Sequence, residues 1–205
     1  FQDSDVAKWL EAVAYSLTVK PDKELEDRAD AIIDVIEKAQ QPDGYLNTYF
    51  TIKEPEHRWQ NLHECHELYC AGHMMEAAAA YYEATGKDKL LKVMERMADH
   101  IGSIFGPDKR PGIPGHQEIE IGLMAMYHVT GDDKYLRLAQ YFIDERGRNP
   151  HFFEEEKEKR GWTHFGLDPK DTLYNQSFAP VREQKDAVGH SVRAVYMYTA
   201  MADIA

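Results

Sequence analysis

One stretch decides the fold of this chain: His63-Glu64-Cys65-His66-Glu67-Leu68-Tyr69-Cys70-Ala71-Gly72-His73. It places three histidines, two glutamates and two cysteines in one short window and leads into a long apolar run, so we predict a helix over 62–84. Its Gly72-His73 pair recurs as Gly115-His116 and Gly189-His190, each time near the start of a helical run. A histidine brought repeatedly to a helix start predicts that these side chains line one central space.

The same spacing of apolar residues at three- and four-residue steps predicts helices elsewhere in the chain. Tyr82–Leu90 matches Tyr127–Tyr135 around a shared Thr-Gly, a period of about 45 residues that corresponds to one helix, a tight turn and a second helix. We therefore predict an all-α fold of packed hairpins, with the charge run Glu154–Arg160 as a solvated turn or short helix. The further predicted helices cover 5–19, 23–41, 90–105, 116–129, 133–146 and about 184 or 186 to 203.

Three of these helices, near 62–84, 116–129 and 186–203, are expected to be inner helices whose N-terminal ends lie at one side. Since the chain has 205 residues with 43% hydrophobic and 29% charged residues, we expect one globular domain over 1–205 and no second domain. A net charge of −12 argues against a nucleic-acid surface, and no apolar run approaches the ~20 residues of a membrane span. With no basic-then-apolar leader, we predict a cytoplasmic location.

The two cysteines, Cys65 and Cys70, are predicted to lie in one helix on different faces, which disfavours a disulfide between them. We interpret both as buried structural thiols. A zinc site formed with His66 or His73 is the alternative, but the spacing is not the CxxC of structural zinc. We therefore predict no metal ligand and no cofactor in this chain.

No phosphate loop, nucleophile elbow, HExxH or dinucleotide fingerprint is present. The candidates that remain are His66, His116 and His190, each close to polar residues such as Tyr69 and Gln117. In a ring of hairpins the inner helices point their N-terminal ends toward one mouth, so these side chains are predicted to share a polar pocket. A structural role for each single histidine is the competing interpretation.

An aromatic-rich segment over 43–60 contains Tyr45 and Trp59, which either cover a ligand or seal the end of the helical core. Sugar hydrolysis needs two carboxyl groups across the scissile bond, and six acids qualify by type. The six candidates are Asp43, Glu64, Glu67, Glu118, Glu120 and Glu183. Their spacing selects no pair, so we assign no catalytic residue.

Several segments together resemble glycoside hydrolase family 127, the β-L-arabinofuranosidase family first catalogued as a domain of unknown function. They follow in the right order along nearly the whole chain: Phe1–Val6, Lys8–Ala12, Pro42–Thr48, His66–His73, Pro114–Glu120, Pro180–Gln184 and Ala187–Ala194. The resemblance implies an (α/α)6 barrel and retaining hydrolysis of terminal β-L-arabinofuranosides. It also implies that His66, His116 and His190 contact the sugar, the choice of His66 over His63 and His73 being left open.

Tyr45, Trp59 and Tyr69 are expected to pack against the sugar ring or close the pocket, and Gln117, a polar neighbour of His116, completes the predicted substrate-binding set. In that family a zinc-bound cysteine is the nucleophile and a separate glutamate the acid/base, and no segment here matches either. A ring of six hairpins has twelve helices, whereas this sequence predicts about seven, so we interpret it as the N-terminal half of the catalytic barrel, inactive alone. We expect its open face to be covered by the other half or by a second copy.

Two other functions are consistent with helical hairpins. A non-catalytic repeat module that binds a protein partner along a groove would scatter the three histidines along its surface. A lyase or epimerase on a similar barrel would use a tyrosine or histidine base. A glycosidase differs from the repeat module because its histidines surround one pocket.

Overall fold

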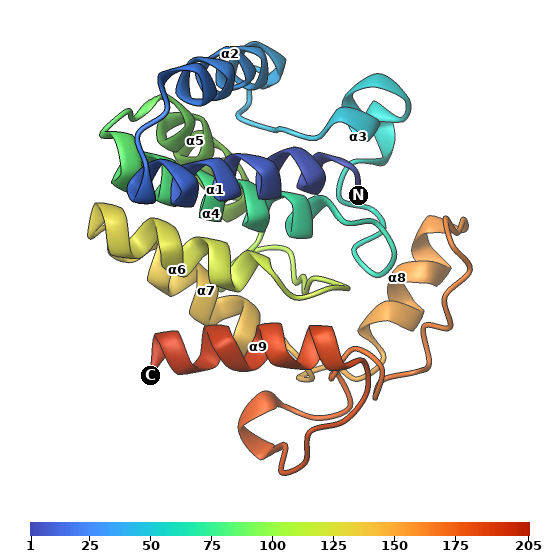
Figure 1. The fold of residues 1–205 in the computed structure, drawn as a ribbon. Helices are drawn as coiled ribbons and strands as arrows, with labels where there is room; N and C mark the ends of the chain where they lie inside the picture. The colour runs from blue at the N-terminus through green and yellow to red at the C-terminus, as the bar shows by residue number, and fades with distance from the viewer.

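A computed structural model describes all residues 1–205 and is built of helices and loops without a β-sheet (Figure 1). The single extended pairing is an isolated bridge between Phe105 and Arg110. The elements are α1 (Asp3–Val19), α2 (Lys23–Ala39), α3 (Thr48–Ile52), η1 (Pro55–His57), α4 (Glu67–Thr85), α5 (Lys89–Ile104), α6 (Ile119–Thr130), α7 (Asp133–Glu145), α8 (Phe152–Arg160), η2 (Val181–Glu183) and α9 (Ser191–Ile204). The predicted all-α fold is confirmed.

Four helices form an inner layer. Figure 1 shows α1, α4, α6 and α9 running side by side with their N-terminal ends at the same side, while α5 and α7 lie behind them. Helix α4 is buried along almost its whole length, whereas α2, α5 and α7 bury one face only. The common direction predicted for the helices after His66, His116 and His190 is confirmed, and α1 joins them. No helix combines the length and apolar composition needed to cross a membrane.

The repeated Thr-Gly pair ends two of the helices. Gly86 and Gly131 take left-handed backbone conformations, with φ of 72° and 69°. Their N–H groups donate to the carbonyls of Tyr82 and Tyr127, which closes each helix. Residues with a side chain rarely adopt this conformation, so the glycine sets the turn between inner and outer helix.

The predicted starts of the three inner helices are wrong by several residues. Helix α4 begins at Glu67 rather than 62, because the N–H groups of Glu64 and Cys65 donate to the side chain and the carbonyl of Asn61 in a preceding turn. Cys65 therefore lies outside the helix that contains Cys70. Helix α6 begins at Ile119 instead of 116, and α9 at Ser191 instead of 184 or 186. The histidines consequently lie in the segments that enter the helices.

The charge run is a helix, α8, but it is not wholly solvated as predicted. Glu156 is 8% exposed and accepts hydrogen bonds from the N–H groups of Leu62 (2.8 Å) and His63 (3.2 Å). Arg160 pairs with the same carboxylate at 2.8 Å. Because one turn of this polar helix is buried against the 62–63 loop, α8 fixes the segment that precedes α4.

The inner helices α4 and α6 touch through glycines. A Cβ atom on Gly122 would lie 2.4 Å from the carbonyl oxygen of Gly72, and one on Gly72 would lie 2.7 Å from that of Glu118. Backbone cannot give way as a flexible side chain does, so this contact admits no larger residue.

We expect Gly122→Ala to destabilise the protein by about 1–3 kcal/mol or more, because the added methyl forces α4 and α6 apart. Gly102→Ala is the matched control in α5, where the nearest atom to a new Cβ is Leu138 Cδ2 at 3.6 Å. That change should be neutral or stabilising by up to about 1 kcal/mol. Thermal and urea unfolding of both variants measure the difference, and equal stabilities would contradict the close contact.

Candidate functional site

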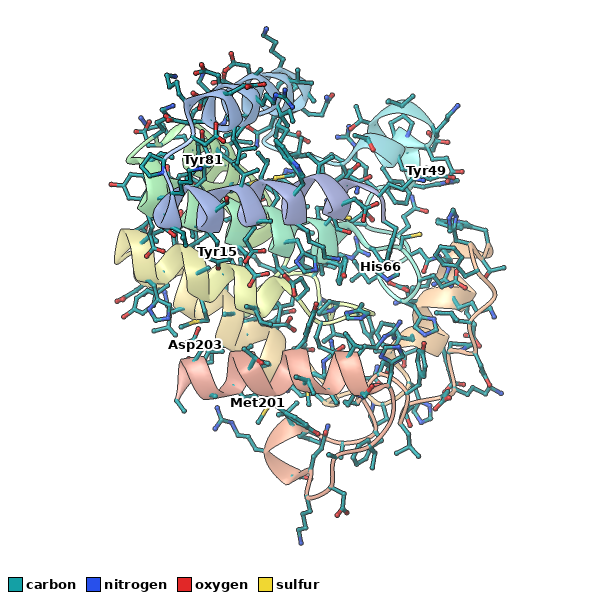
Figure 2. The ribbon with its side chains drawn as sticks, in the orientation of Figure 1. Tyr15, Tyr49, His66, Tyr81, Met201 and Asp203 are labelled. Carbon is teal, nitrogen blue, oxygen red and sulfur yellow. The ribbon has the colours of Figure 1, made fainter.

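Four of the predicted site residues come together at the end of the inner layer where the helices begin. The rings of His66 and His116 have centroids 5.9 Å apart, and those of His116 and His190 are also 5.9 Å apart. Tyr69 lies 4.8 Å from His116 and 5.3 Å from His66. Figure 2 shows His66 at this end, beside the start of α4. We call these four residues the histidine site; its three histidines are half-buried and thus open to a ligand.

Two of the three histidines in the site, His66 and His116, are uncharged at neutral pH. Burial lowers the pKa of His66 to about 3 and that of His116 to about 4, so both imidazoles are neutral above pH 5. Nδ1 of His116 lies 2.7 Å from the carbonyl oxygen of Gln117, which can only accept, so this nitrogen holds the proton and Nε2 is an acceptor. Nδ1 of His190 accepts from the N–H of Arg193, which makes its Nε2 a donor. One donor and one acceptor suit a hydroxyl-bearing ligand.

Arg193 fixes the position of the loop that contains His116. Its side chain is 3% exposed and runs from α9 to the carbonyl of Gly115, to which Nη1 donates at 2.8 Å. The N–H of Gly115 in turn donates to the carbonyl of Leu62 at 2.9 Å, and a Cβ here would lie 2.0 Å from the oxygen of His63. Our sequence analysis missed Arg193, since a basic residue in a helix ordinarily indicates solvent.

Three residues predicted to contact substrate are corrected. Tyr45 and Trp59 are 0% and 4% exposed, pack edge to face at 5.3 Å and seal the core, so neither presents a face to a ligand. The Tyr45 hydroxyl and the Trp59 N–H both donate to Glu67, a buried carboxyl. Gln117 is also buried, and its amide donates to Gln176 Oε1 at 2.9 Å. All three support the site from within.

A cavity of about 360 Å³ adjoins His66. Its wall includes Tyr49 and Phe50 from α3 and His164 and Phe165 from the loop after α8. The rings of Tyr49 and His164 meet at 5.5 Å, so the two loops close on each other beside His66. Tyr49 and Phe50 belong to the aromatic-rich segment 43–60 singled out from the sequence, whereas the part of the wall in 161–167 was not predicted because it contains no periodic segment.

The buried carboxylate of Glu64 holds that loop in place. It accepts from the N–H groups of His164 (2.6 Å) and Leu167 (2.9 Å) and from the hydroxyl of Thr163 (2.6 Å). Burial alone would raise the pKa of Glu64, but these donors outweigh it and lower the pKa to about 2. The carboxylate is therefore ionised at neutral pH and serves as an anchor for the loop.

The six carboxyl residues considered from the sequence do not form a pair at the histidine site. Glu64, Glu67, Glu118 and Glu120 are almost completely buried, and the first two have the structural partners described above. Asp43 and Glu183 are exposed. The structure thus gives no reason to assign a catalytic acid or base within this chain.

The cysteines do not fit a zinc-thiolate centre. Burial raises the pKa of the Cys65 thiol to about 12 and that of Cys70 to about 11, so both remain protonated. Cys70 Sγ donates to the carbonyl of Phe1 at 3.7 Å. Zinc binds the deprotonated thiolate, and neither cysteine belongs to a group of clustered ligand atoms. We therefore assign no zinc-dependent step to Cys65 or Cys70.

The model of the β-L-arabinofuranosidase GH127 catalytic domain matches residues 1–205 of this chain. The chain belongs to the GH127 family. It is 43% identical to the non-reducing end β-L-arabinofuranosidase of Bifidobacterium longum subsp. longum, with 100% of this chain and 32% of that protein aligned. The resemblance drawn from the seven sequence segments is confirmed.

Two solved structures of GH127 proteins have the same fold. A GH127 β-L-arabinofuranosidase from Geobacillus stearothermophilus T6 is 60% identical with a TM-score of 0.94, and 100% of this chain covers 32% of it. The GH127 β-arabinofuranosidase BT3674 is 40% identical with a TM-score of 0.82, and 100% of this chain covers 31% of it. The chain thus spans about a third of the length of these relatives and corresponds to the helical N-terminal part of their catalytic domain.

Replacing Glu64 with Gln should free the loop over 161–167, because an amide is a weaker acceptor and repels one N–H donor. Limited proteolysis of the variant should cut this loop faster at neutral pH. In the unchanged protein, loop protection is full above the ordinary carboxyl pKa of 4.5 and is lost as the pH falls toward about 2, the pKa in the folded state.

Glu154→Gln serves as the control, since Glu154 meets only the exposed His151 on the same helix. It should leave the cutting rate unchanged. Equal rates of loop cleavage in Glu64→Gln and the unchanged protein would show that Glu64 does not hold the loop.

Proposed function

We propose that this chain forms the sugar-binding part of a retaining hydrolase that acts on terminal β-L-arabinofuranosides. The observation that carries the proposal is the meeting of His66, His116 and His190 with Tyr69 at one mouth of the inner layer. Membership of GH127 supplies the substrate class, since the named relatives are β-L-arabinofuranosidases.

Neutral imidazoles suit a furanose. A sugar hydroxyl both donates and accepts, and His190 offers a donor where His116 offers an acceptor. Because these rings are half-buried, a hydroxyl that loses its partner there is not fully rehydrated, which gives each contact discrimination against sugars of other shape. Tyr69 is 6% exposed, with Phe1 stacked on its ring, so it holds the rings of His66 and His116 in place from beneath.

The proposed reaction needs catalytic groups that are not among residues 1–205. We place the acid/base glutamate, the cysteine nucleophile and its zinc in the remainder of the natural protein, which would also complete a closed ring of six hairpins. Exposed apolar side chains at both edges of the inner layer support this closure: Trp9 on α1 is 37% exposed, and Val192 and Val195 on α9 are 45% and 58% exposed. Cover by a second copy, and the cytoplasmic location, stay predictions.

The repeat-module alternative is not favoured by any contact in the structure. It requires the three histidines to lie apart along a groove, whereas neighbouring rings here are less than 6 Å apart. We therefore keep the hydrolase as the single proposed function.

In the natural full-length protein, His116→Ala and His190→Ala should each lower kcat/KM on p-nitrophenyl β-L-arabinofuranoside by roughly ten- to a thousandfold. A lost hydrogen bond costs ~0.5–1.5 kcal/mol and a buried group left unpaired adds ~1–3, at about 1.4 kcal/mol per tenfold. The α anomer should not be turned over by either form.

His128→Ala is the matched control, because His128 is an exposed histidine at the other end of α6 that meets only Asp203. Its kcat/KM should stay within twofold of the unchanged protein. If the two site variants lose melting temperature but keep normal kcat/KM per folded molecule, these are core histidines and the sugar site is wrong.

A further inference from the structure

A second cluster of ionisable side chains lies farther along the inner layer. His73 and Glu76 are on α4, about two turns beyond His66, and Glu118 immediately precedes α6. His73 is 4% exposed and Glu118 is 1% exposed, while the side chain of Glu76 is 23% exposed. The cluster therefore bridges the two helices that touch through Gly72 and is reached by way of Glu76.

The ligand atoms of the three residues converge at ion-pair distances. His73 Nδ1 lies 2.9 Å from Glu118 Oε1 and 3.3 Å from Glu76 Oε2. One ligand atom from each of the three residues lies within 4.8 Å of the others. Yet both ring nitrogens of His73 and Oε1 of Glu118 have no hydrogen-bond partner. Buried polar atoms are ordinarily paired, so these three atoms call for a bound group.

The spacing matches metal coordination. Nitrogen and oxygen ligands at ~2.0–2.2 Å from a tetrahedral ion are roughly 3.3–3.5 Å from one another. The 3.3 Å from His73 Nδ1 to Glu76 Oε2 lies in this range, and the 2.9 Å to Glu118 Oε1 is shorter and would lengthen around an ion. Three protein ligands leave one position of such an ion for water or another small ligand.

The charge of the surroundings also favours a cation. Glu118 faces the carboxyl groups of Glu76, Glu120 and Glu11, and neither Glu76 nor Glu118 forms an ion pair with a lysine or arginine. A divalent ion would offset the negative charge of these neighbouring carboxyl groups.

We propose that His73, Glu76 and Glu118 bind one divalent transition-metal ion of the zinc class, which joins α4 to α6. An imidazole with two carboxylates selects such an ion over Mg²⁺ or Ca²⁺, which prefer oxygen ligands alone. This proposal differs from our sequence-based expectation of no metal ligand in the chain. That expectation considered only zinc sites that include Cys65 or Cys70, and this site contains neither. It does not depend on the sugar site and is tested without measuring activity.

The test uses the natural full-length protein, stripped with a chelator at neutral pH, supplied with excess Zn²⁺ and desalted. Zinc per protein is then measured by mass spectrometry, and the melting temperature is recorded before and after zinc addition. Glu118→Gln and His73→Gln should each hold one equivalent fewer than the unchanged protein and lose part of the zinc-dependent rise in melting temperature. Taking the difference removes zinc bound elsewhere in the protein.

Two controls isolate the cluster. His128→Gln changes an exposed histidine that pairs with Asp203, and Cys65→Ser/Cys70→Ser removes both thiols. Both variants should hold as much zinc as the unchanged protein. Equal zinc in Glu118→Gln, His73→Gln and the unchanged protein overturns the proposal.

A measurement on the unchanged protein covers the case in which the variants do not fold. Crystals grown with Zn²⁺ should give an anomalous difference peak between His73 Nδ1 and the carboxylates of Glu76 and Glu118. A map with no peak there overturns the proposal whatever the variants do.

Discussion

The backbone contact between α4 and α6 determines how the rest of the inner layer is arranged. Helices packed through larger side chains have axes 8–10 Å apart, and a Gly72–Gly122 contact allows a closer approach. The contact fixes the axial register of the two helices as well as their separation. His66 consequently reaches His116 on one side of the contact and His73 reaches Glu118 beside it. The positions of both sites therefore depend on the glycines at 72 and 122.

Buried carboxylates, rather than apolar residues, hold the loops at the mouth of this layer. Glu67 accepts from the N–H of Trp59, whose φ of 62° is unfavourable for a residue with a large side chain. Glu156 accepts from the N–H of Leu62 in the same way. Burial raises the pKa of Glu67 to about 8 and that of Glu156 to about 7 in spite of these hydrogen bonds, so at neutral pH Glu67 is largely protonated and Glu156 is partly ionised. The loops gain one fixed conformation from these hydrogen bonds.

The sequence predicted what depends on local pattern and missed what depends on contacts between distant segments. Thr-Gly pairs and apolar periodicity located the helices and their ends, because a left-handed glycine terminates a helix wherever it occurs. Helix starts were predicted too early, since the turn at Asn61 uses side-chain hydrogen bonds that apolar spacing does not report.

The candidate site was likewise predicted only where a local sequence pattern marks its residues. His116 and His190 each follow a glycine near a helix start, whereas His66 follows Cys65 and was selected by its polar neighbours and by the family resemblance. Tyr45 and Trp59 were assigned to the ligand because aromatic composition does not distinguish a lid from a buried seal. Arg193 was missed because its partner is a backbone carbonyl far away in the chain. The proposed metal ligands His73 and Glu118 lie on α4 and just before α6, and no sequence motif joins them.

The histidine site is made by tied loops more than by the helices themselves. Parallel inner helices bring their starts to one side, but the rings meet at 5.9 Å only because the segment before α6 is drawn to its neighbours. Arg193 holds this segment to α9, and Gly115 holds it to the loop before α4. In an open helical repeat each hairpin is stabilised by packing its apolar face on its neighbour. Such a fold does not need a buried arginine to tie the loops of successive hairpins together at one end. The cost of desolvating Arg193 is explained when the three loops must present their histidines to one small ligand.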